Sequence, residues 1–507
     1  MNSCAVLGMN GYPLTVEVDV SAGIVRFDIV GLPDAAVRES RERVRAALRN
    51  SGFEFPLRRI TVNLAPANIK KEGALLDLPI AIGILAATDQ IRCGENLGKS
   101  AIVGELSLEG VVRPISGALP MAFCLGQNPD LQYFFVPAAN GEEAAIAEKI
   151  VVYGVDNLRQ VTEILAAPEA ASQVTVDRER LFERVDGYEQ DMSDVKGQQG
   201  VKRALTVAAA GAHNVLMIGA PGSGKTMLAK RLPSLLPPLT LSESIEVTKL
   251  YSISGQLPPG QPLLITRPFR SPHHGASAAS IIGGGATPRP GEISLASHGI
   301  LLMDDLPEFS RDVLEALRQP LEENQVTVAR VSARVDYPAD FQLVAAMNPC
   351  PCGYYGDSQR ICTCTPYMRH RYLHRISGPL LDRIDLHVEV PRVDYQELAG
   401  KNGQPVSSAA LRQQVQAARE IQQRRFAGKK SSVNARMSRR DLEKYCICDG
   451  AASDLLQEAF GRLRMSGRAH DRILKVARTI ADLAGREQIE ATHIAEAIQY
   501  RSLDREE

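Results

Sequence analysis

The stretch Asn214–Thr226, with the sequence NVLMIGAPGSGKT, decides the fold of this 507-residue chain. An apolar strand is predicted over Asn214–Ile218, and it leads through a glycine-rich loop into a predicted helix over Met227–Leu236. A strand, such a loop and a helix in this order predict a P-loop, in which backbone N–H groups and the helix N-terminus hold phosphate oxygens. The loop has the pattern G-x-x-x-x-G-K-T and consists of Gly219, Ala220, Pro221, Gly222, Ser223, Gly224, Lys225 and Thr226.

The last two residues of this loop have expected roles in binding ATP and Mg²⁺. Lys225 is expected to reach the β- and γ-phosphates, and the Thr226 hydroxyl to bind the metal ion. A magnesium site of this kind needs a carboxylate after a neighbouring buried strand, and Ile300–Asp305, with the sequence ILLMDD, supplies it. Asp304 is the candidate magnesium ligand, and Asp305 is the candidate for activating the attacking water. The alternative interpretation is a plain glycine turn and two acids that close a strand.

Length and composition set limits on the rest of the chain. A chain of 507 residues is too long for one compact core, so two to four domains are expected. Hydrophobic residues make up 44% and charged residues 23%, which is typical of a soluble globular protein. The N-terminus does not resemble a secretory signal, and the longest apolar stretch, Leu75–Ala87, is shorter than the roughly 20 residues of a membrane span. A cytoplasmic protein without a membrane segment is expected.

The sequence pattern changes three times along the chain and predicts four regions. Residues 1–167 alternate β-rich runs with helical patterns and predict a mixed α/β domain with its own core. The polar stretch 168–193 predicts a linker. A second α/β unit, which contains the P-loop, is expected over 194–392. Residues 393–507 are expected to form an all-α lid, with helical spacing from about Ser407 onward.

Several motifs together resemble the magnesium-chelatase branch of the AAA+ ATPases, and more specifically its ComM/YifB-like family. The branch is indicated by the P-loop and by Leu302–Phe309 (LMDDLPEF), Met347–Pro349 (MNP) and Leu380–Leu386 (LLDRIDL). The family is indicated by Arg267–His274 (RPFRSPHH), Gly283–Gly285 and Pro290–Ala296 (PGEISLA). The resemblance covers nearly the whole chain. It implies an α/β/α P-loop core, a C-terminal helical lid and an N-terminal α/β domain with the fold of the Lon protease catalytic domain, of the ribosomal S5 type.

The resemblance also implies roles for residues outside the P-loop. Asn348, which follows an apolar strand, matches the sensor 1 position, although Asn before Pro is by itself a common turn. Arg383 matches the arginine finger that one subunit offers to its neighbour, which implies a homo-hexameric ring. Arg468 matches sensor 2 in the lid, with Arg472 as a close competitor. Asp305 stands where the family has Glu, so the resemblance supports ATP binding more strongly than fast hydrolysis.

The N-terminal domain is expected to be a scaffold or binding module and not a protease. Three segments fit the Lon-like fold: Asn63–Ala67 (NLAPA), Lys71–Gly73 (KEG) and Gly104–Leu106 (GEL). Lon-like proteases place a nucleophilic serine shortly after the glycine, where this chain has Ala74–Asp77 (ALLD). The partner lysine is also missing, since Val111–Met121 contains none. Without both groups there is no activated nucleophile.

A cysteine-rich loop, 350–364, follows the predicted sensor 1 strand. Four of the nine cysteines of the chain lie on it: Cys350, Cys352, Cys362 and Cys364. Four thiolates suit a tetrahedral structural Zn²⁺, and Gly353 and Gly356 would let the loop fold back. Reduced thiols without a metal, or a redox switch, are the alternatives. Cys446 and Cys448 lack such partners and are expected to be core residues.

The family resemblance implies a DNA motor that includes branch migration of recombination intermediates during uptake of foreign DNA, with recombination proteins as partners. The formal net charge is −1, so any contact with DNA has to use a local basic face. Seven Lys or Arg and no acids occur over Gln422–Arg440, and Arg369–Arg375 contains three arginines and two histidines. Such clusters can bind phosphates, and a solvated helix face explains them equally well.

In related ATPases an insertion and a hairpin project into the channel of the ring. Here the insertion would span about Tyr251–Gly291, and the hairpin would use Val326–Tyr337 with Arg330 and Arg334. Alternating Val and polar residues do predict a two-stranded hairpin there. Arginines of such a hairpin suit a channel that follows a DNA backbone, and an ordinary hairpin with exposed arginines is the alternative.

Three functions therefore remain open from the sequence. The first is an ATP-driven hexameric DNA translocase, such as a helicase or branch-migration factor in recombination or natural transformation. The second is a chelatase-like remodeller of a protein partner, which the Lon-like domain disfavours. The third is a slow ATP-dependent switch, if Asp305 cannot support rapid hydrolysis.

Overall fold

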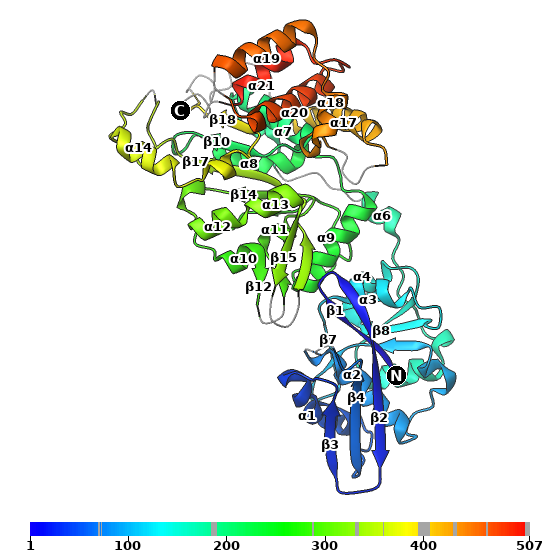
Figure 1. Ribbon diagram of the computed structural model, residues 1–507. Helices are drawn as coiled ribbons and strands as arrows, with labels where there is room; N and C mark the ends of the chain where they lie inside the picture. Colours follow the sequence, from blue (N-terminus) through cyan, green and yellow to red (C-terminus); the bar gives the residue numbers. More distant parts are fainter. Residues whose placement is uncertain are drawn as a thin grey trace. The chain divides into compact units, whose positions relative to one another are not determined.

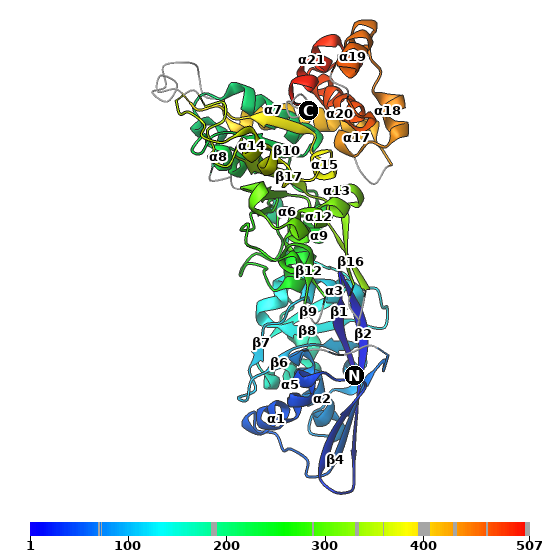
Figure 2. The same cartoon turned by 60° about the vertical axis from the view of Figure 1, so that its left-hand side comes forward.

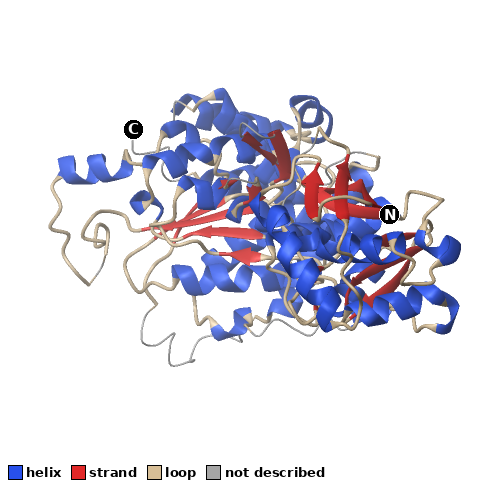
Figure 3. Ribbon diagram, turned by 90° about the horizontal axis from the view of Figure 1, so that it is seen from below, coloured by secondary structure: helices blue, strands red, loops and turns tan. Residues whose placement is uncertain are grey.

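The structure, a computed structural model, describes residues 1–68, 71, 73–183, 190–285, 288–329, 334–357, 359–393, 406–428, 433–462 and 465–501. The chain divides into two compact units (Figure 1). The first consists of Met1–Val185 and Thr240–Ile265, and the second of Asp186–Leu239 and Thr266–Glu507. Both units mix helices and strands (Figure 3). Among the residues described above, no helix is both long enough and apolar enough to span a bilayer.

The first unit is built on a seven-stranded mixed sheet in the order β3-β4-β2-β1-β5-β8-β9. Its strands are β1 (Asn2–Leu7), β2 (Asn10–Ser21), β3 (Arg26–Val30), β4 (Arg59–Ala65), β5 (Ser100–Ile102), β8 (Tyr133–Pro137) and β9 (Val151–Val155). A separate pair is formed by β6 (Glu105–Leu106) and β7 (Val112–Arg113). The helices of the unit are α1 (Ala35–Asn50), α2 (Asp77–Ala87), α3 (Ala118–Leu125), α4 (Gly141–Ala145), α5 (Leu158–Ala166), α6 (Arg178–Glu183) and α9 (Leu241–Ser254).

The longest apolar stretch of the sequence forms α2, a helix that is buried from Asp77 to Leu85. Asp77 is a fully buried carboxylate that accepts hydrogen bonds from the Ser40 hydroxyl and, at 2.6 Å, from Nε of Arg43. A buried carboxylate has to be paired in this way, because an uncompensated charge in the core is costly. The segment Ala74–Asp77 therefore ends in a carboxylate that is engaged in the packing of α1 on α2.

Helix α9 follows the P-loop helix in sequence but belongs to the first unit. It starts at a capping box in which Thr240 and Glu243 bond each other's backbone N–H groups. Its Ser252 hydroxyl donates to the Glu143 carboxylate, and Lys249 Nζ lies 4.3 Å from the centre of the Phe123 ring on α3. The sequence-based boundaries assign this segment to the region 194–392, whereas its contacts group it with the N-terminal residues.

The second unit contains a five-stranded parallel sheet in the order β11-β14-β17-β10-β18. Its strands are β10 (Val215–Ile218), β11 (Phe269–Arg270), β14 (Ile300–Met303), β17 (Gln342–Met347) and β18 (Leu386–Glu389). Two antiparallel hairpins are formed by β12 (Gly283–Gly284) with β13 (Arg289–Pro290) and by β15 (Gln325–Ala329) with β16 (Arg334–Pro338). Every residue of the three central strands, β14, β17 and β10, is buried, as expected of parallel strands that are covered on both faces.

Helices surround this sheet and continue into an all-α lid (Figure 2). Around the sheet lie α7 (Gln199–Gly211), α8 (Lys225–Arg231), α10 (Ala278–Ile282), α11 (Glu292–Leu295), α12 (Arg311–Ala316), α13 (Arg318–Glu323), α14 (Pro366–Leu373) and α15 (Gly378–Leu381). The lid consists of α17 (Ser408–Arg425), α18 (Arg439–Tyr445), α19 (Gly450–Arg462), α20 (Gly467–Leu483) and α21 (Ala491–Gln499). The predicted fold class, two α/β regions and a helical C-terminal region, is confirmed.

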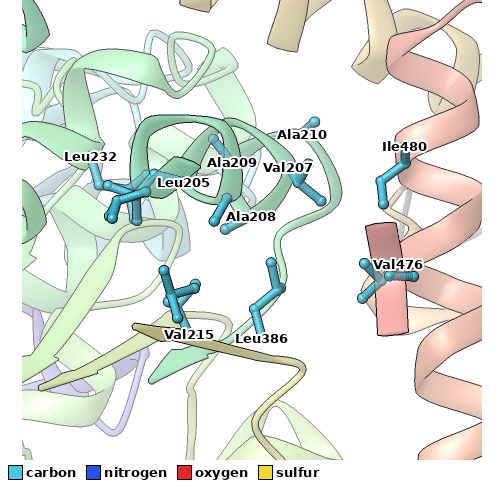
Figure 4. Close-up of a cluster of buried hydrophobic side chains, with 14 of the residues drawn as sticks. Leu205, Val207, Ala208, Ala209, Ala210, Val215, Leu232, Leu386, Val476 and Ile480 are labelled. Carbon is cyan, nitrogen blue, oxygen red and sulfur yellow. The ribbon is translucent and has the colours of Figure 1, made fainter. Parts of the chain in front are cut away.

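One hydrophobic cluster joins the sheet to the lid through α7 (Figure 4). Ala208, Ala209 and Ala210 are fully buried, and their small side chains let the helices α17 and α20 pack close to α7. Val215 of the sheet and Ile480 of α20 belong to the same cluster. The lid is therefore part of the core of this unit.

A buried polar network holds the lid helices together around Asp482, which is 3% exposed. Arg425 of α17 donates two hydrogen bonds to its carboxylate, at 2.5 and 2.7 Å. Arg478, which is 1% exposed, donates through Nε at 3.1 Å, and the amide of Asn434 donates at 2.8 Å. One carboxylate thus pairs two arginines, which ties three segments of the lid to each other.

We expect Asp482→Ala to destabilise the second unit by about 3–5 kcal/mol, because two arginines lose their buried counter-charge. Calorimetry should show a lower midpoint temperature for this unit. Asp454→Ala, at an exposed position of α19, is the matched control and should leave the midpoint unchanged. Equal midpoints for the two variants would contradict this account of the lid.

Candidate nucleotide site and cysteine-rich loop

The glycine-rich loop lies between the carboxyl end of β10 and the start of α8. Gly222 and Gly224 have φ angles of +79° and +93°, which residues with a side chain rarely adopt. Gly219 lies so close to the residue that follows β18 that a Cβ atom there would be 2.4 Å from the Val390 carbonyl oxygen. The loop therefore needs glycine at these positions, and it presents the N-terminus of α8 at the edge of the sheet.

Lys225 is buried at the mouth of this loop. Its ammonium group donates to the carbonyl oxygens of Gly219 at 2.8 Å and Ala220 at 3.1 Å, and to Oδ1 of Asn348 at 3.3 Å. Burial lowers the pKa of Lys225, and the nearby carboxylates of Asp304 and Asp305 oppose this shift. A positive charge is thus held in position over the loop.

The residues of the expected magnesium site meet at the same edge. Oγ1 of Thr226 donates to Oδ2 of Asp304 at 2.7 Å, although 78 positions separate the two residues. Asp304 follows β14, Asn348 follows β17, and the loop follows β10, and these three parallel strands are neighbours in the sheet. A hydroxyl, a carboxylate, an amide and an ammonium group therefore converge where the phosphates and Mg²⁺ of a nucleotide would bind.

Asp305, the next residue, has a left-handed backbone conformation with φ of +52°. Asp and Asn tolerate this conformation better than most residues with a side chain. Its backbone N–H donates to Oδ1 of Asp304 at 3.1 Å, which fixes the direction of the turn. The carboxylates of these two consecutive residues both oppose the lowering of the Lys225 pKa.

One residue that contacts the P-loop was not identified from the sequence. Gln198, at the start of α7, is buried, and its Nε2 donates to the Ser223 carbonyl at 2.8 Å and to the Pro391 carbonyl at 3.0 Å. It joins the P-loop to the end of β18. A single glutamine carries no sequence signal for such a contact, because the two acceptors are backbone groups from distant segments.

Arg383 lies at the opposite edge of the sheet from the P-loop. Its carbonyl oxygen accepts from Nδ2 of Asn214, which precedes β10, whereas the P-loop follows β10. The four residues of β10 separate the two edges by roughly 13 Å, at about 3.3 Å per residue. The structure does not bring Arg383 to the Lys225 of its own chain.

Arg383 instead lines a cavity of about 350 Å³ together with the two sensor 2 candidates. Arg468 is mostly exposed and lies 3.6 Å from Asp382, whereas Arg472 is mostly buried and donates to Asp385 at 2.8 Å. The pKa of Arg383 is lowered, first by burial and then by the charges of neighbouring arginines. Arginine and lysine line this cavity at five positions, Arg383, Arg436, Arg468, Arg472 and Lys475, and acids at four, Glu322, Asp382, Asp385 and Asp471.

The four cysteines of the loop after β17 come together as a compact group. One sulfur atom from each lies within 4.8 Å of the others. The Sγ atom of Cys350 is 3.3 Å from that of Cys352 and 3.7 Å from that of Cys362. The backbone N–H groups of Cys352 and Cys364 each point at a cysteine sulfur, at 3.4 Å. A Zn²⁺ ion 2.3 Å from each thiolate would hold the sulfurs about 3.8 Å apart, so the group fits a tetrahedral metal.

A parallel sheet with a P-loop after one strand, a polar residue after the adjacent strand and an acidic residue after the strand beyond it defines a P-loop ATPase. Family models agree with this class over most of the chain. Residues 191–398 match "Magnesium chelatase, subunit ChlI", residues 16–140 match "Subunit ChlI of Mg-chelatase", and residues 405–501 match "Magnesium chelatase, subunit ChlI C-terminal".

Relatives extend this finding over the full length. The competence protein ComM of Haemophilus influenzae is 43% identical over 505 residues, covering 99% of this chain and 97% of the relative. The uncharacterized protein YifB of Salmonella typhimurium is also 43% identical, covering 99% of this chain and 96% of the relative. Lon protease 2 of Bacillus subtilis is 31% identical over 137 residues, 24% of each chain. The chain belongs to the ComM/YifB-like family of magnesium-chelatase-related AAA+ ATPases.

We expect Asp305→Asn to bind ATP like the unchanged protein but to hydrolyse it about 100-fold more slowly or worse, because an amide cannot accept the proton of the attacking water. Asn also tolerates the left-handed conformation, so the turn should persist. Lys225→Ala should lose ATP binding. Lys230→Ala, at an exposed position of α8, should change neither property. Single-turnover hydrolysis and titration with a fluorescent ATP analogue separate the two effects, and normal turnover in Asp305→Asn would contradict the assignment.

Proposed function

We propose that this protein is an ATP-hydrolysing DNA motor that works as a homo-hexamer, a helicase or branch-migration factor of recombination or natural transformation. The observation that carries the proposal is the separation of its catalytic groups. The phosphate-binding residues lie at one edge of the parallel sheet and the arginine-lined cavity lies at the other edge. Neither half is a complete site for phosphoryl transfer.

The half with the P-loop binds and orients ATP. Lys225 would reach the β- and γ-phosphates, and Thr226 and Asp304 would hold a Mg²⁺ ion, which would supply positive charge to the phosphate oxygens. Asn348, which already accepts from Lys225, contacts the γ-phosphate or the attacking water. Asp305 accepts the proton of that water. The groups with these roles follow β10, β17 and β14, three strands that lie next to one another in the sheet.

The other half completes the site of a neighbouring subunit. Arg383 supplies the positive charge that stabilises the transition state, and Arg468 or Arg472 adds a second charge from the lid. Of the two, Arg468 is the more exposed and therefore the more accessible to a neighbour, while Arg472 is engaged with Asp385. Since each subunit completes the site of the next, hydrolysis depends on assembly. Head-to-tail contacts of this kind can close into a ring.

We expect mixed rings of Lys225→Ala and Arg383→Ala subunits to hydrolyse ATP although neither variant does so alone. An intact P-loop of one subunit then meets an intact Arg383 of the next. Arg383→Ala alone should retain ATP binding and lose about a thousandfold or more in turnover, as is typical of arginine fingers. ATPase assays at fixed total protein measure the effect.

Arg439→Ala, at a position that is 88% exposed on the lid, is the control and should keep full activity. Inactive mixtures, in which light scattering shows that both variants still assemble together, would exclude a shared site.

The hairpin of β15 and β16 is the DNA-contacting element that the geometry favours. Val326, Val328 and Val335 are buried on one face, and Arg334 is exposed. The two strands pair in the register that the alternating sequence predicts. Arg330, the other candidate, lies outside the described residues. Arginines on an exposed hairpin can follow a DNA backbone by charge, without reading its sequence.

The other basic clusters are less available to DNA. In the Gln422–Arg440 segment, Arg425 pairs with Asp482 and Arg436 with Asp340. Two of its charges are therefore structural. On α14, Arg369 stacks 3.9 Å from the centre of the Tyr355 ring, and this helix remains a secondary surface for DNA.

The family relation supports DNA as the partner. The relative from Haemophilus influenzae, which aligns over nearly the whole chain, is named a competence protein. Competence requires the handling of incoming DNA strands, which suits a ring that moves along DNA. The Lon-like N-terminal unit is proposed as a scaffold or binding module, since its Asp77 is engaged in packing.

We also propose a structural Zn²⁺ at the four cysteines. Cys350, Cys352, Cys362 and Cys364 supply four thiolates, the ligand set of closed structural zinc sites. The metal would cross-link the loop and take no part in hydrolysis.

We expect single-stranded or forked DNA to accelerate ATP hydrolysis, and Arg334→Ala to weaken this stimulation. Loss of one phosphate contact should also reduce the slope of log affinity against log salt by about one. Arg439→Ala, on the competing basic segment, is the matched variant and should behave like the unchanged protein. If DNA does not change the ATPase rate and the protein does not separate DNA strands, the motor is contradicted. A large increase in the ATPase rate of Asp305→Glu would favour the slow ATP-dependent switch.

A further inference from the structure

The cysteine-rich loop, residues 350–364, is seated directly on the P-loop. Gly353 has a φ angle of +83°, and a Cβ atom built there would lie 2.6 Å from Cδ and 2.7 Å from Cγ of Pro221. The same Cβ would be 3.9 Å from the carboxamide carbon of Asn348. The loop backbone therefore packs on one residue that shapes the phosphate loop and close to another that bonds Lys225.

A second contact ties this loop to the other flank of the nucleotide site. Asp357 accepts from Nε of Arg392 at 2.6 Å. Arg392 follows Pro391, whose carbonyl oxygen accepts from Gln198, and Gln198 also donates to the Ser223 carbonyl of the P-loop. The cysteine-rich loop and the P-loop are thus connected at Pro221 and again through the end of β18.

Apart from its sulfur atoms, the loop is held by polar contacts: Asp357 accepts from the backbone N–H groups of Gln359 and Arg360, and Arg360 donates to the Tyr354 hydroxyl. No helix or strand occurs among the described residues between β17 and α14. Among the described residues of that segment only Cys350 and Gly353 are buried as whole residues, and the apolar side chain of Ile361 is 92% exposed. A loop without an apolar core is stabilised further by a cross-link, and a metal bound by four thiolates would provide one.

We propose that the metal at the four cysteines controls the nucleotide site: with the metal bound, Gly353 is held against Pro221 and ATP binds tightly, and without it the P-loop loses this support and affinity falls. The inference rests on the proposed ATP and zinc sites. Because coupling between two sites is reciprocal, ATP binding strengthens metal retention by the same factor.

The chain offers a matched pair of glycines for testing the contact. Gly353 and Gly356 lie on the same loop with φ angles of +83° and +76°, so alanine strains the backbone similarly at both. A Cβ atom at Gly356 would have nothing within 4 Å, whereas at Gly353 it meets Pro221. A difference between the two alanine variants therefore reports the contact with the P-loop.

The experiment uses the full-length protein and measures two quantities for each variant: bound zinc, by metal analysis, and the Kd of a fluorescent ATP analogue. We expect Gly353→Ala and Gly356→Ala to retain zinc, and only Gly353→Ala to bind the nucleotide at least about tenfold more weakly. The double variant Cys352→Ser/Cys364→Ser should lose zinc and show a similar loss of nucleotide affinity. Cys446→Ser, in the lid, should change neither quantity.

The remaining outcomes separate this inference from the proposed function. If the double cysteine variant loses zinc and binds ATP as tightly as the unchanged protein, or if both glycine variants bind it equally well, the coupling is excluded and the ATPase stands. If the unchanged protein carries no zinc, the coupling is excluded as well. If it binds zinc but no ATP, the proposed function itself fails. Circular dichroism of the cysteine variant shows whether the rest of the chain is folded, and Gly353→Ala tests the contact with the metal retained.

Discussion

The nucleotide site depends on the burial of one positive charge, the ammonium group of Lys225. An ammonium that leaves water needs acceptors around it, and here they are two carbonyls of the P-loop and the amide of Asn348. These acceptors follow β10 and β17, and the carboxylate of Asp304 follows β14. They can converge only if the three strands are parallel neighbours that end at one edge. The topology of the sheet therefore brings together the groups that surround this charge.

The sequence revealed the parts of the molecule that are encoded locally. The strand, loop and helix around Lys225, the hairpin of β15 and β16 and the helical lid follow from short-range patterns, and the structure contains all of them. The seating of Gly353 on Pro221 and the bond of Arg472 to Asp385 have no such pattern. They depend on which distant segments the fold brings together, so the sequence left the choice between Arg468 and Arg472 open.

The lid and the sheet share one core, which limits how the two can move. Apolar side chains of α20 pack in the same cluster as those of α7 and of the strands. A bonded chain of polar groups runs beside this cluster, in which His213 bridges Asp385 and Thr479. A displacement of the lid would therefore also shift Asp385 and the neighbouring Arg383. The lid and the arginine-lined cavity are therefore linked through this chain of polar groups.

The membership of α9 in the first unit has a consequence for synthesis on the ribosome. Ile245 of this helix and Leu263 after it pack with Leu119 and Ile146, which are made much earlier. Until residue 265 has emerged, that apolar patch lacks the part of its cover that Ile245 and Leu263 provide, and by then the whole P-loop has emerged too. The N-terminal unit therefore completes this apolar cluster only after the P-loop sequence has been synthesised.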